Sequence, residues 1–189
     1  GWTGLLALPA GQKFPPPKNT TGYGNPDPDI EQIRAWAQQP HNIALRLPTN
    51  VIGIDVDAYG DKIGAQTLKE LESTLGALPA TWTATSRQDG VSGIRLFKAV
   101  ISGNNVCSHA GTDIDVIRYE HRYAVVWPSI HPSGDMYRWR NPEGVIVDCV
   151  PSVDELPVLP AAWVAYISRT PRQAAAQRTM QSSNKNVQI

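Results

Sequence analysis

The sequence has few cysteines and no long hydrophobic run, and these absences exclude several classes of protein. Only Cys107 and Cys149 occur among the 189 residues, and no CxxC pair is present. We therefore expect no zinc site, and we expect both cysteines to be reduced, as in a cytosolic protein. Because there is no stretch of about eighteen apolar residues and no charged-then-apolar leader, neither a membrane-spanning helix nor a signal peptide is expected.

The chain also lacks net charge, since 17 basic residues balance 17 acidic ones. This balance argues against a basic coat that binds nucleic acid over the whole surface, but it does not exclude a local basic site. Three of the four histidines lie between residues 87 and 140. The same stretch holds seven basic side chains, namely Arg87, Arg95, Lys98, Arg118, Arg122, Arg138 and Arg140. A site for a polyanion is expected in this stretch.

The hydrophobic content of 41% is enough for one compact domain or two small lobes. Residues 1–28 are rich in proline and glycine and are expected to be an irregular segment packed on the core. Residues 29–168 are expected to form the main domain, and residues 169–189 a linker toward further domains. Helices are expected from Asp29 until Pro40, over 61–75 and over 161–167, and strands over 42–47, 51–56, 81–85, 94–99, 113–117, 123–127 and 136–139.

The clearest chemical signal is a pair of acids at the end of an apolar strand, Ile52-Gly53-Ile54-Asp55-Val56-Asp57. Residues two apart on a strand point to the same face, so Asp55 and Asp57 should lie side by side. Two close carboxylates repel each other, and a divalent cation such as Mg²⁺ would relieve this repulsion. The alternative is that Asp57 caps the following turn while Asp55 has a basic partner.

A third acid follows in Asp113-Ile114-Asp115-Val116-Ile117, another short apolar strand. Asp115 is the preferred member, whereas Asp113 could be a solvated residue at the strand edge. A third carboxylate is what a site with two metal ions requires.

Two further stretches offer polar groups that could bind phosphate or sugar. Ser92 enters a strand that carries Arg95 and Lys98, and an arginine near a metal pair is suited to grip a triphosphate. Later, Pro128-Ser129-Ile130-His131 delivers Ser129 and His131 into a turn. His131 could hold a phosphate when protonated or a ribose hydroxyl when neutral. The alternatives are an exposed strand residue for Arg95 and a structural hydrogen bond for His131.

Taken in order over about residues 20–160, these motifs resemble the bifunctional primase-polymerase domain of the archaeo-eukaryotic primase superfamily. The matching segments are Asn42–Arg46, the acid pair, Ser92–Phe97, Asp115 and Trp127–His131. The resemblance implies an α+β fold with an N-terminal α/β lobe, a lobe like an RNA-recognition motif, and an active cleft between them. It further implies a DNA primase and DNA polymerase of a phage or plasmid, acting in the cytoplasm of a bacterial host.

The resemblance also assigns roles to residues. Asp55, Asp57 and Asp115 would be catalytic and hold two Mg²⁺ or Mn²⁺ ions. The nucleotide would contact Ser92, Arg95, Lys98, Ser129 and His131, and further contacts to template or nucleotide would come from Arg46, Arg118, His121 and Arg122. The implied partners are a single-stranded DNA template, a primer strand, ribo- or deoxyribonucleoside triphosphates, and a helicase domain downstream.

One departure from the family pattern concerns the second motif, which usually ends in histidine, whereas Arg95 was matched to it here. Arginine keeps a phosphate-binding role but removes a proton-transfer role, and His109, His121 or His131 could supply an imidazole from elsewhere. Two other functions use similar residues: a metal-dependent nuclease, and a non-catalytic nucleic-acid-binding module of a replication initiator.

Overall fold

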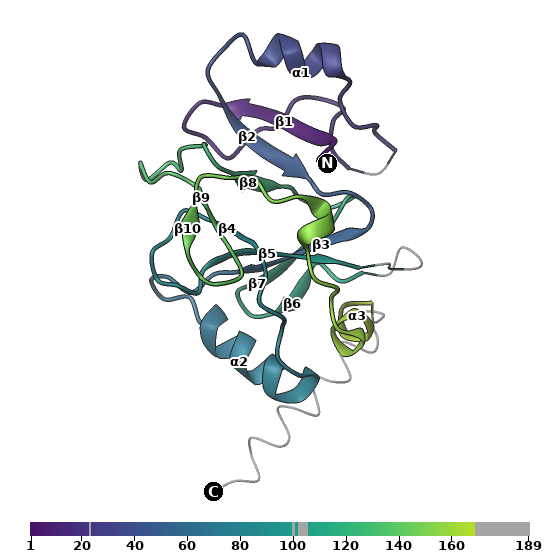
Figure 1. Ribbon diagram of the computed structural model, residues 1–189, viewed down its shortest axis with the longest axis vertical. Helices are drawn as coiled ribbons and strands as arrows, with labels where there is room; N and C mark the ends of the chain where they lie inside the picture. The colour runs from purple at the N-terminus through teal and green to yellow at the C-terminus, as the bar shows by residue number, and fades with distance from the viewer. Residues whose placement is uncertain (23, 100, 102–105, 169–189) are drawn as a thin grey trace, which may run out of the picture.

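The structure, a computed structural model, describes residues 1–22, 24–99, 101 and 106–168 (Figure 1). In this part of the chain there are three α-helices and ten strands, which make an α+β architecture. The helices are α1 (Ile30–Trp36), α2 (Gly64–Leu75) and α3 (Ala161–Ile167), with a short 3-10 helix at Val153–Glu155. The strands are β1 (Gly4–Pro9), β2 (His41–Arg46), β3 (Val51–Val56), β4 (Thr83–Thr85), β5 (Gly93–Lys98), β6 (His109–Gly111), β7 (Ile114–Ile117), β8 (Ala124–Val126), β9 (Arg138–Arg140) and β10 (Ile146–Val147).

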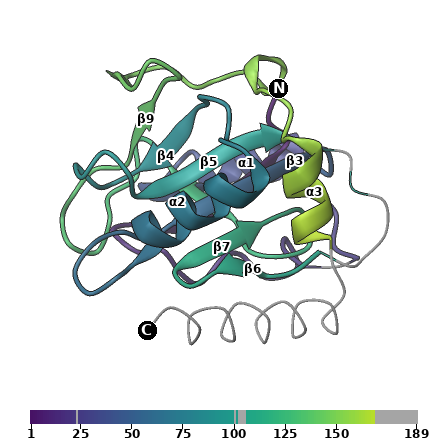
Figure 2. The same cartoon turned by 90° about the horizontal axis from the view of Figure 1, so that it is seen from below.

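The strands form two sheets that lie in separate layers. The small sheet has the order β1-β2-β8, and the large sheet has the order β10-β9-β4-β5-β3-β7-β6. Every neighbouring pair in both sheets is antiparallel. Helix α1 lies on the outer side of the small sheet, while α2 and α3 lie on the far side of the large sheet (Figures 1 and 2).

Strand β3, near the middle of the large sheet, separates two hydrophobic clusters. Ile52, Ile54 and Val56 pack with side chains of α2 and α3. Val51, on the alternate face, packs in the cluster that contains residues of the small sheet. Because side chains alternate along a strand, Asp55 has the same parity as Val51 and belongs to the face that looks toward the small sheet.

Most of the elements expected from the sequence are present with shifted ends. Helix α3 spans 161–167 as expected, and Asp29 caps α1 by accepting a hydrogen bond from the backbone N–H of Gln32 at 2.8 Å. Helix α2 begins at Gly64 rather than Asp61. The backbone N–H of Gly64 donates to the carbonyl oxygen of Asp57 at 2.9 Å, and a Cβ at Gly64 would lie only 2.3 Å from that oxygen. Glycine therefore lets the start of α2 approach the end of β3.

The structure differs from the sequence expectation at the N-terminus. Residues 4–9, within the segment expected to be irregular, form β1, which pairs with β2 along its whole length. The run Gly-Leu-Leu-Ala-Leu-Pro has no polar alternation, so only pairing with the distant β2 defines it as a strand. Strands β6 and β10 were also not expected. The expected linker, 169–189, lies outside the described residues, and no helix among those described is long and apolar enough to span a membrane.

Candidate active site

One edge of the large sheet, the row of strand ends where β3 and β4 finish, brings together chain segments that are far apart in the sequence. Strands β3 and β4 both run antiparallel to β5, so they run in the same direction and end at the same edge. Strands β5, β7 and β9 begin at that edge, because β7 is antiparallel to β3 and β9 to β4. The residues just after β3 and β4, and those at the start of the other three strands, therefore meet.

The three aspartates selected from the sequence lie at this edge. Asp55 of β3 is directly opposite Asp115 of β7 in the strand register. Directly opposed residues of an antiparallel pair have Cβ atoms roughly 4.5–5.5 Å apart and point to the same face. Asp57 follows the end of β3, and its backbone N–H donates to the carbonyl oxygen of Asp113 at 2.9 Å. Asp113 itself is turned away, since its carboxylate pairs with Lys62 at 2.8 Å and accepts the N–H of Ile63 at 3.0 Å.

Asp115 is occupied by two basic neighbours. One carboxylate oxygen contacts Nδ1 of His109, and the other accepts a hydrogen bond from the guanidinium of Arg122. In the described part of the chain, no group of three or more His, Cys, Asp or Glu side chains is close enough to hold a metal ion. Among the described residues, neither Asp55 nor Asp57 forms a salt bridge with a basic side chain.

The electrostatics of the site favour the arrival of positive charge. Burial first, and then the carboxylates of Asp57 and Asp115, raise the pKa of Asp55 to about 7, against the lowering effect of Arg122 and Lys13. Burial also raises the pKa of Asp57, with Lys62 opposing and Asp115 adding to the shift. Because burial is the largest cause of both shifts and neighbouring carboxylates add to it, a cation that enters the site would stabilise the ionised form of both aspartates.

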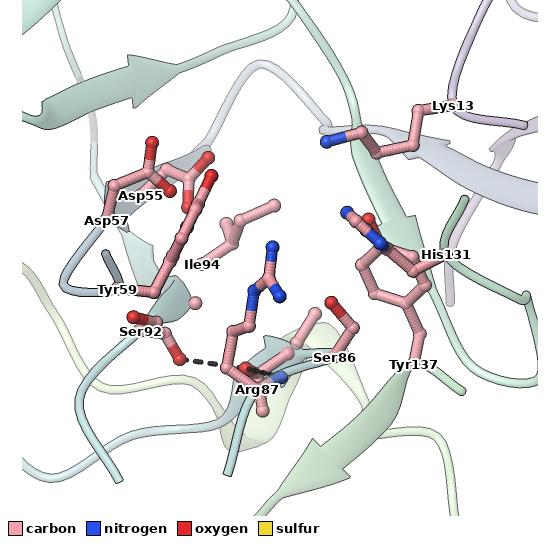
Figure 3. Close-up of a pocket in the computed structure, with 13 residues that line it drawn as sticks. Lys13, Asp55, Asp57, Tyr59, Ser86, Arg87, Ser92, Ile94, His131 and Tyr137 are labelled. Atoms are coloured by element: carbon pink, nitrogen blue, oxygen red, sulfur yellow. Dashed lines mark hydrogen bonds between the residues drawn. The ribbon is translucent and has the colours of Figure 1, made fainter. Parts of the chain in front are cut away.

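A pocket opens beside the two aspartates (Figure 3). Its lining combines the acids with three basic side chains and two tyrosines, which come from the large sheet and the turns beside it, from the turn after β8 and from the N-terminal segment. The lining residues are Lys13, Asp55, Asp57, Tyr59, Ala84, Thr85, Ser86, Arg87, Ser92, Gly93, Ile94, His131 and Tyr137. Such a pocket has the mixed charge that a phosphorylated ligand and a cation together would require.

Ser92 lines this pocket but is buried, with an exposed fraction of 1%, and its hydroxyl serves the fold. The hydroxyl donates to the Asp89 carboxylate at 2.6 Å and accepts the backbone N–H of Ala58 at 3.0 Å. Ser92 therefore fastens the turn that follows Asp57 to the start of β5. Ser92 therefore affects the aspartates by holding this turn in position.

Arg95 and Lys98 do not line the pocket, although the sequence proposed them for nucleotide binding. Arg95 is opposite Ile54 in the register, whereas Ile94 is opposite Asp55. Arg95 therefore points to the α2 side of the sheet, where its guanidinium donates to the carbonyl oxygen of Val91 at 2.7 Å. Lys98 donates to the carbonyl oxygen of Asp154 at 3.0 Å, at the other end of β5. The residue of β5 that faces the acids is an isoleucine.

Of the two polar residues in the Pro-Ser-Ile-His turn, Ser129 stabilises the fold and His131 lines the pocket. Ser129 is 2% exposed and bonds to both backbone groups of Ile43, which joins the end of β8 to β2. His131 lines the pocket, and its Nδ1 accepts the backbone N–H of Ser133 at 3.0 Å. Burial, Lys13 and Arg87 lower the pKa of His131, which favours the neutral ring.

The four residues proposed for template or nucleotide contacts also lie outside the pocket. Arg46 is 1% exposed, stacks over the Tyr119 ring at 3.6 Å and donates to backbone carbonyls of Gly22, Asn25 and Tyr119. Arg118 lies 3.7 Å from Glu120, and Arg122 is bound to Asp115. His121 is half-buried beside Arg118 and Arg122, which together with burial lower its pKa.

Six polar residues of the pocket were not proposed as site residues from the sequence, although Arg87 lies in the basic stretch expected to bind a polyanion: Lys13, Tyr59, Thr85, Ser86, Arg87 and Tyr137. Ser86 and Arg87 directly follow β4, as Asp57 directly follows β3. This shared position would have identified them had the direction of β4 relative to β3 been known. Lys13 comes from the segment expected to be irregular, and nothing in its local sequence indicates that it reaches the acids.

Comparison with models of protein families shows which family the chain resembles. The model of the Prim-Pol family, described as bifunctional DNA primase/polymerase, N-terminal, matches residues 1–162. Neither the curated proteins nor the solved structures yielded a match.

Proposed function

The chain belongs to the bifunctional DNA primase/polymerase N-terminal family, and from this premise we propose that it catalyses template-directed nucleotidyl transfer. In this reaction the 3′-hydroxyl of a primer, or of a first nucleotide, attacks a nucleoside triphosphate and releases pyrophosphate. We assign the reaction to phage or plasmid DNA replication.

The observation that carries the proposal is the opposition of Asp55 and Asp115, with Asp57 directly after the end of β3. Phosphoryl transfer needs little covalent chemistry from the protein, because positioning and stabilisation of charge supply most of the catalysis. Three acids at one sheet edge, beside a pocket that also contains cationic side chains, provide both requirements.

The residues fit divalent cations such as Mg²⁺ or Mn²⁺, which prefer oxygen ligands. The carboxylates of Asp55 and Asp57 would hold them, and Asp115 would join once its carboxylate leaves His109 and Arg122. The pKa of Asp55, raised by burial and by its acidic neighbours, supports this assignment. When bound, two such cations supply the charge that lowers the pKa of the attacking hydroxyl and neutralises the departing pyrophosphate.

The chain's own polar groups would orient the nucleotide. His131, whose pKa is lowered by burial and by nearby cations, is favoured in its neutral form and therefore suits a ribose hydroxyl better than a phosphate. Ser92 would keep Asp57 in place through its bond to the N–H of Ala58. Tyr137 remains protonated, since burial raises its pKa to about 12, and can donate a hydrogen bond at any working pH.

We further assign the architecture to the two-lobed primase fold, with an active cleft between an α/β lobe and a lobe like an RNA-recognition motif. In support, the pocket takes His131 from the turn after β8 of the small sheet and most of its other residues from the edge of the large sheet. A single-stranded template and a primer strand would enter this cleft. A downstream helicase domain and a cytoplasmic location are part of the same proposal.

The test is primer extension on a single-stranded template with Mn²⁺ and labelled nucleotides. Asp55→Asn and Asp57→Asn should abolish extension, while Asp29→Asn, which replaces one good helix N-cap by another, should not change it. Extension by either active-site variant at the wild-type rate would refute the proposal.

The same assay separates the two other functions. A metal-dependent nuclease would shorten the labelled strand instead of lengthening it. A non-catalytic binding module would neither shorten nor lengthen it, and would bind DNA without metal, with an affinity that falls steeply with salt.

A further inference from the structure

The pocket contains a guanidinium that no carboxylate neutralises. Arg87 lines the pocket directly after β4, and among the described residues its side chain forms no ion pair. In Figure 3 the guanidinium of Arg87 extends into the pocket, between the side that holds Asp55 and Asp57 and the side that holds His131. An arginine that lies near two acids without pairing with them is available to an anionic ligand.

Two contacts hold Arg87 in position, one to its side chain and one to its backbone. The guanidinium carbon lies 4.0 Å from the centroid of the Tyr59 ring, a distance typical of a cation–π contact. The backbone N–H of Arg87 donates to Oγ1 of Thr85 at 3.0 Å, and Thr85 in turn donates to the carbonyl oxygen of Ser92 at 2.8 Å. Tyr59 belongs to the turn after Asp57, so the contact joins the arginine to the same turn as the acids.

No other arginine in the described chain lines the pocket. Arg95 points to the opposite face of the sheet, and the residue of β5 opposite Asp55 is Ile94, which cannot bind a phosphate. Arg122 is bound to Asp115, and Arg46 is bound to backbone carbonyls in the interior. Of the cations that do line the pocket, Lys13 is exposed and carries an ammonium group, which lacks the planar fork of a guanidinium.

We propose that Arg87 binds the triphosphate of the incoming nucleotide and that Tyr59 is a positioning residue that orients its guanidinium. The nucleotide as ligand rests on the proposed function, whereas the affinity for a triphosphate rests on the geometry alone. The phosphates must lie where the acids and the arginine can both reach them, and the pocket provides that place. A planar guanidinium can form two parallel hydrogen bonds to a phosphate, whereas an ammonium cannot. We therefore expect that lysine cannot fully replace arginine at this position.

The experiment measures the affinity of the whole chain, with Mn²⁺ present, for dATP, dAMP and inorganic tripolyphosphate. Arg87→Gln should weaken dATP and tripolyphosphate binding by roughly tenfold to a hundredfold, as expected for a bidentate charged contact, and should leave dAMP binding nearly unchanged. Arg87→Lys should recover only part of the loss. Arg34→Gln, which removes an exposed arginine on α1, should bind all three ligands as the wild type does.

Primer extension adds a second readout, since Arg87→Gln should raise KM for the nucleotide much more than it lowers kcat. Unchanged dATP and tripolyphosphate affinity in a folded Arg87→Gln protein overturns the inference, even if the wild type extends primers. If the wild type fails to extend primers but binds tripolyphosphate through Arg87, the proposed function is lost and the triphosphate site stands. A wild type that binds no triphosphate overturns both.

Discussion

Asp55 and Asp115 occupy directly opposed positions on β3 and β7, and Arg122 binds the second of them. Two carboxylates in this arrangement repel each other, and the partly buried Asp55 bears most of the cost, because its pKa is raised to about 7 first by burial and then by Asp57 and Asp115. Without added cations, the ionised carboxylates therefore lower the free energy of unfolding of the protein.

The first prediction concerns the dependence of stability on pH in the metal-free protein. Because the pKa of Asp55 is 3.8 in its unperturbed form and about 7 in the folded chain, folding favours the protonated group between these values. Its contribution to stability is full below pH 4 and is lost as the pH rises to 7. The loss is at most about 4 kcal/mol.

Asp55→Asn should remove this loss. In EDTA, urea unfolding should show the variant more stable than the wild type at pH 8, with the two converging near pH 4. Asp29→Asn, which alters an exposed carboxylate at a helix cap, should follow the wild-type profile. Parallel profiles for wild type and Asp55→Asn would contradict the assigned pKa.

The second prediction concerns Arg122, which both binds Asp115 and lowers the pKa of Asp55. Arg122→Gln should leave the acids less compensated, so the metal-free variant should be less stable at pH 8 than the wild type. Added Mn²⁺ should then raise the Tm of the variant by more than it raises that of the wild type, because the cation replaces the missing charge. An equal or smaller Mn²⁺ effect would show that Arg122 and the cation do not compete for Asp115.

The acid pair could be located from local sequence, whereas its surroundings could not. Asp55 and Asp57 follow an apolar strand, and alternation alone puts them on one face. The choice between Ile94 and Arg95 depends on the register of β5 against β3, and a shift of one residue reverses every side chain of a strand. The sequence favoured Arg95 for its charge, but charge carries no information on register.

Some elements of the fold can likewise be predicted from local sequence, whereas others depend on residues far away in the chain. The bounds of α3 follow from its own residues, since the prolines before it and the apolar spacing within it are local signals. Strand β1 depends on its partner β2, some forty residues away, and its sequence alone does not distinguish it from an apolar loop. Lys13 reaches the pocket because distant residues hold the chain after β1: the side chain of Asn42 donates to the carbonyl oxygen of Gln12 at 2.8 Å, and the hydroxyl of Tyr123 donates to that of Lys13 at 2.7 Å.

The third prediction concerns Ser92, whose hydroxyl joins Asp89 to the N–H of Ala58. Ser92→Ala should leave the N–H of Ala58 without its partner and lower the free energy of unfolding by about 1–3 kcal/mol. Urea unfolding would measure this loss. Ser73→Ala, which removes a hydroxyl from the exposed side of α2, should cost less than about 0.5 kcal/mol. A loss no larger than this in Ser92→Ala would show that the bridge does not hold the turn.

The last prediction concerns Lys13, whose side chain starts on the far side of the pocket and points its ammonium toward Asp55 and Asp57 (Figure 3), where it lowers the pKa of both. Lys13→Gln should raise the pKa of Asp55 and weaken nucleotide binding by a few-fold, less than Arg87→Gln does, because an exposed ammonium is screened by water and salt. The dependence of nucleotide Kd on salt should also become weaker in this variant. Lys18→Gln, five residues further along the same exposed segment and outside the pocket, is the matched control. Equal nucleotide affinity and equal salt dependence in Lys13→Gln and Lys18→Gln would remove Lys13 from the binding site, leaving Arg87 and His131 as the basic side chains of the pocket that meet the nucleotide.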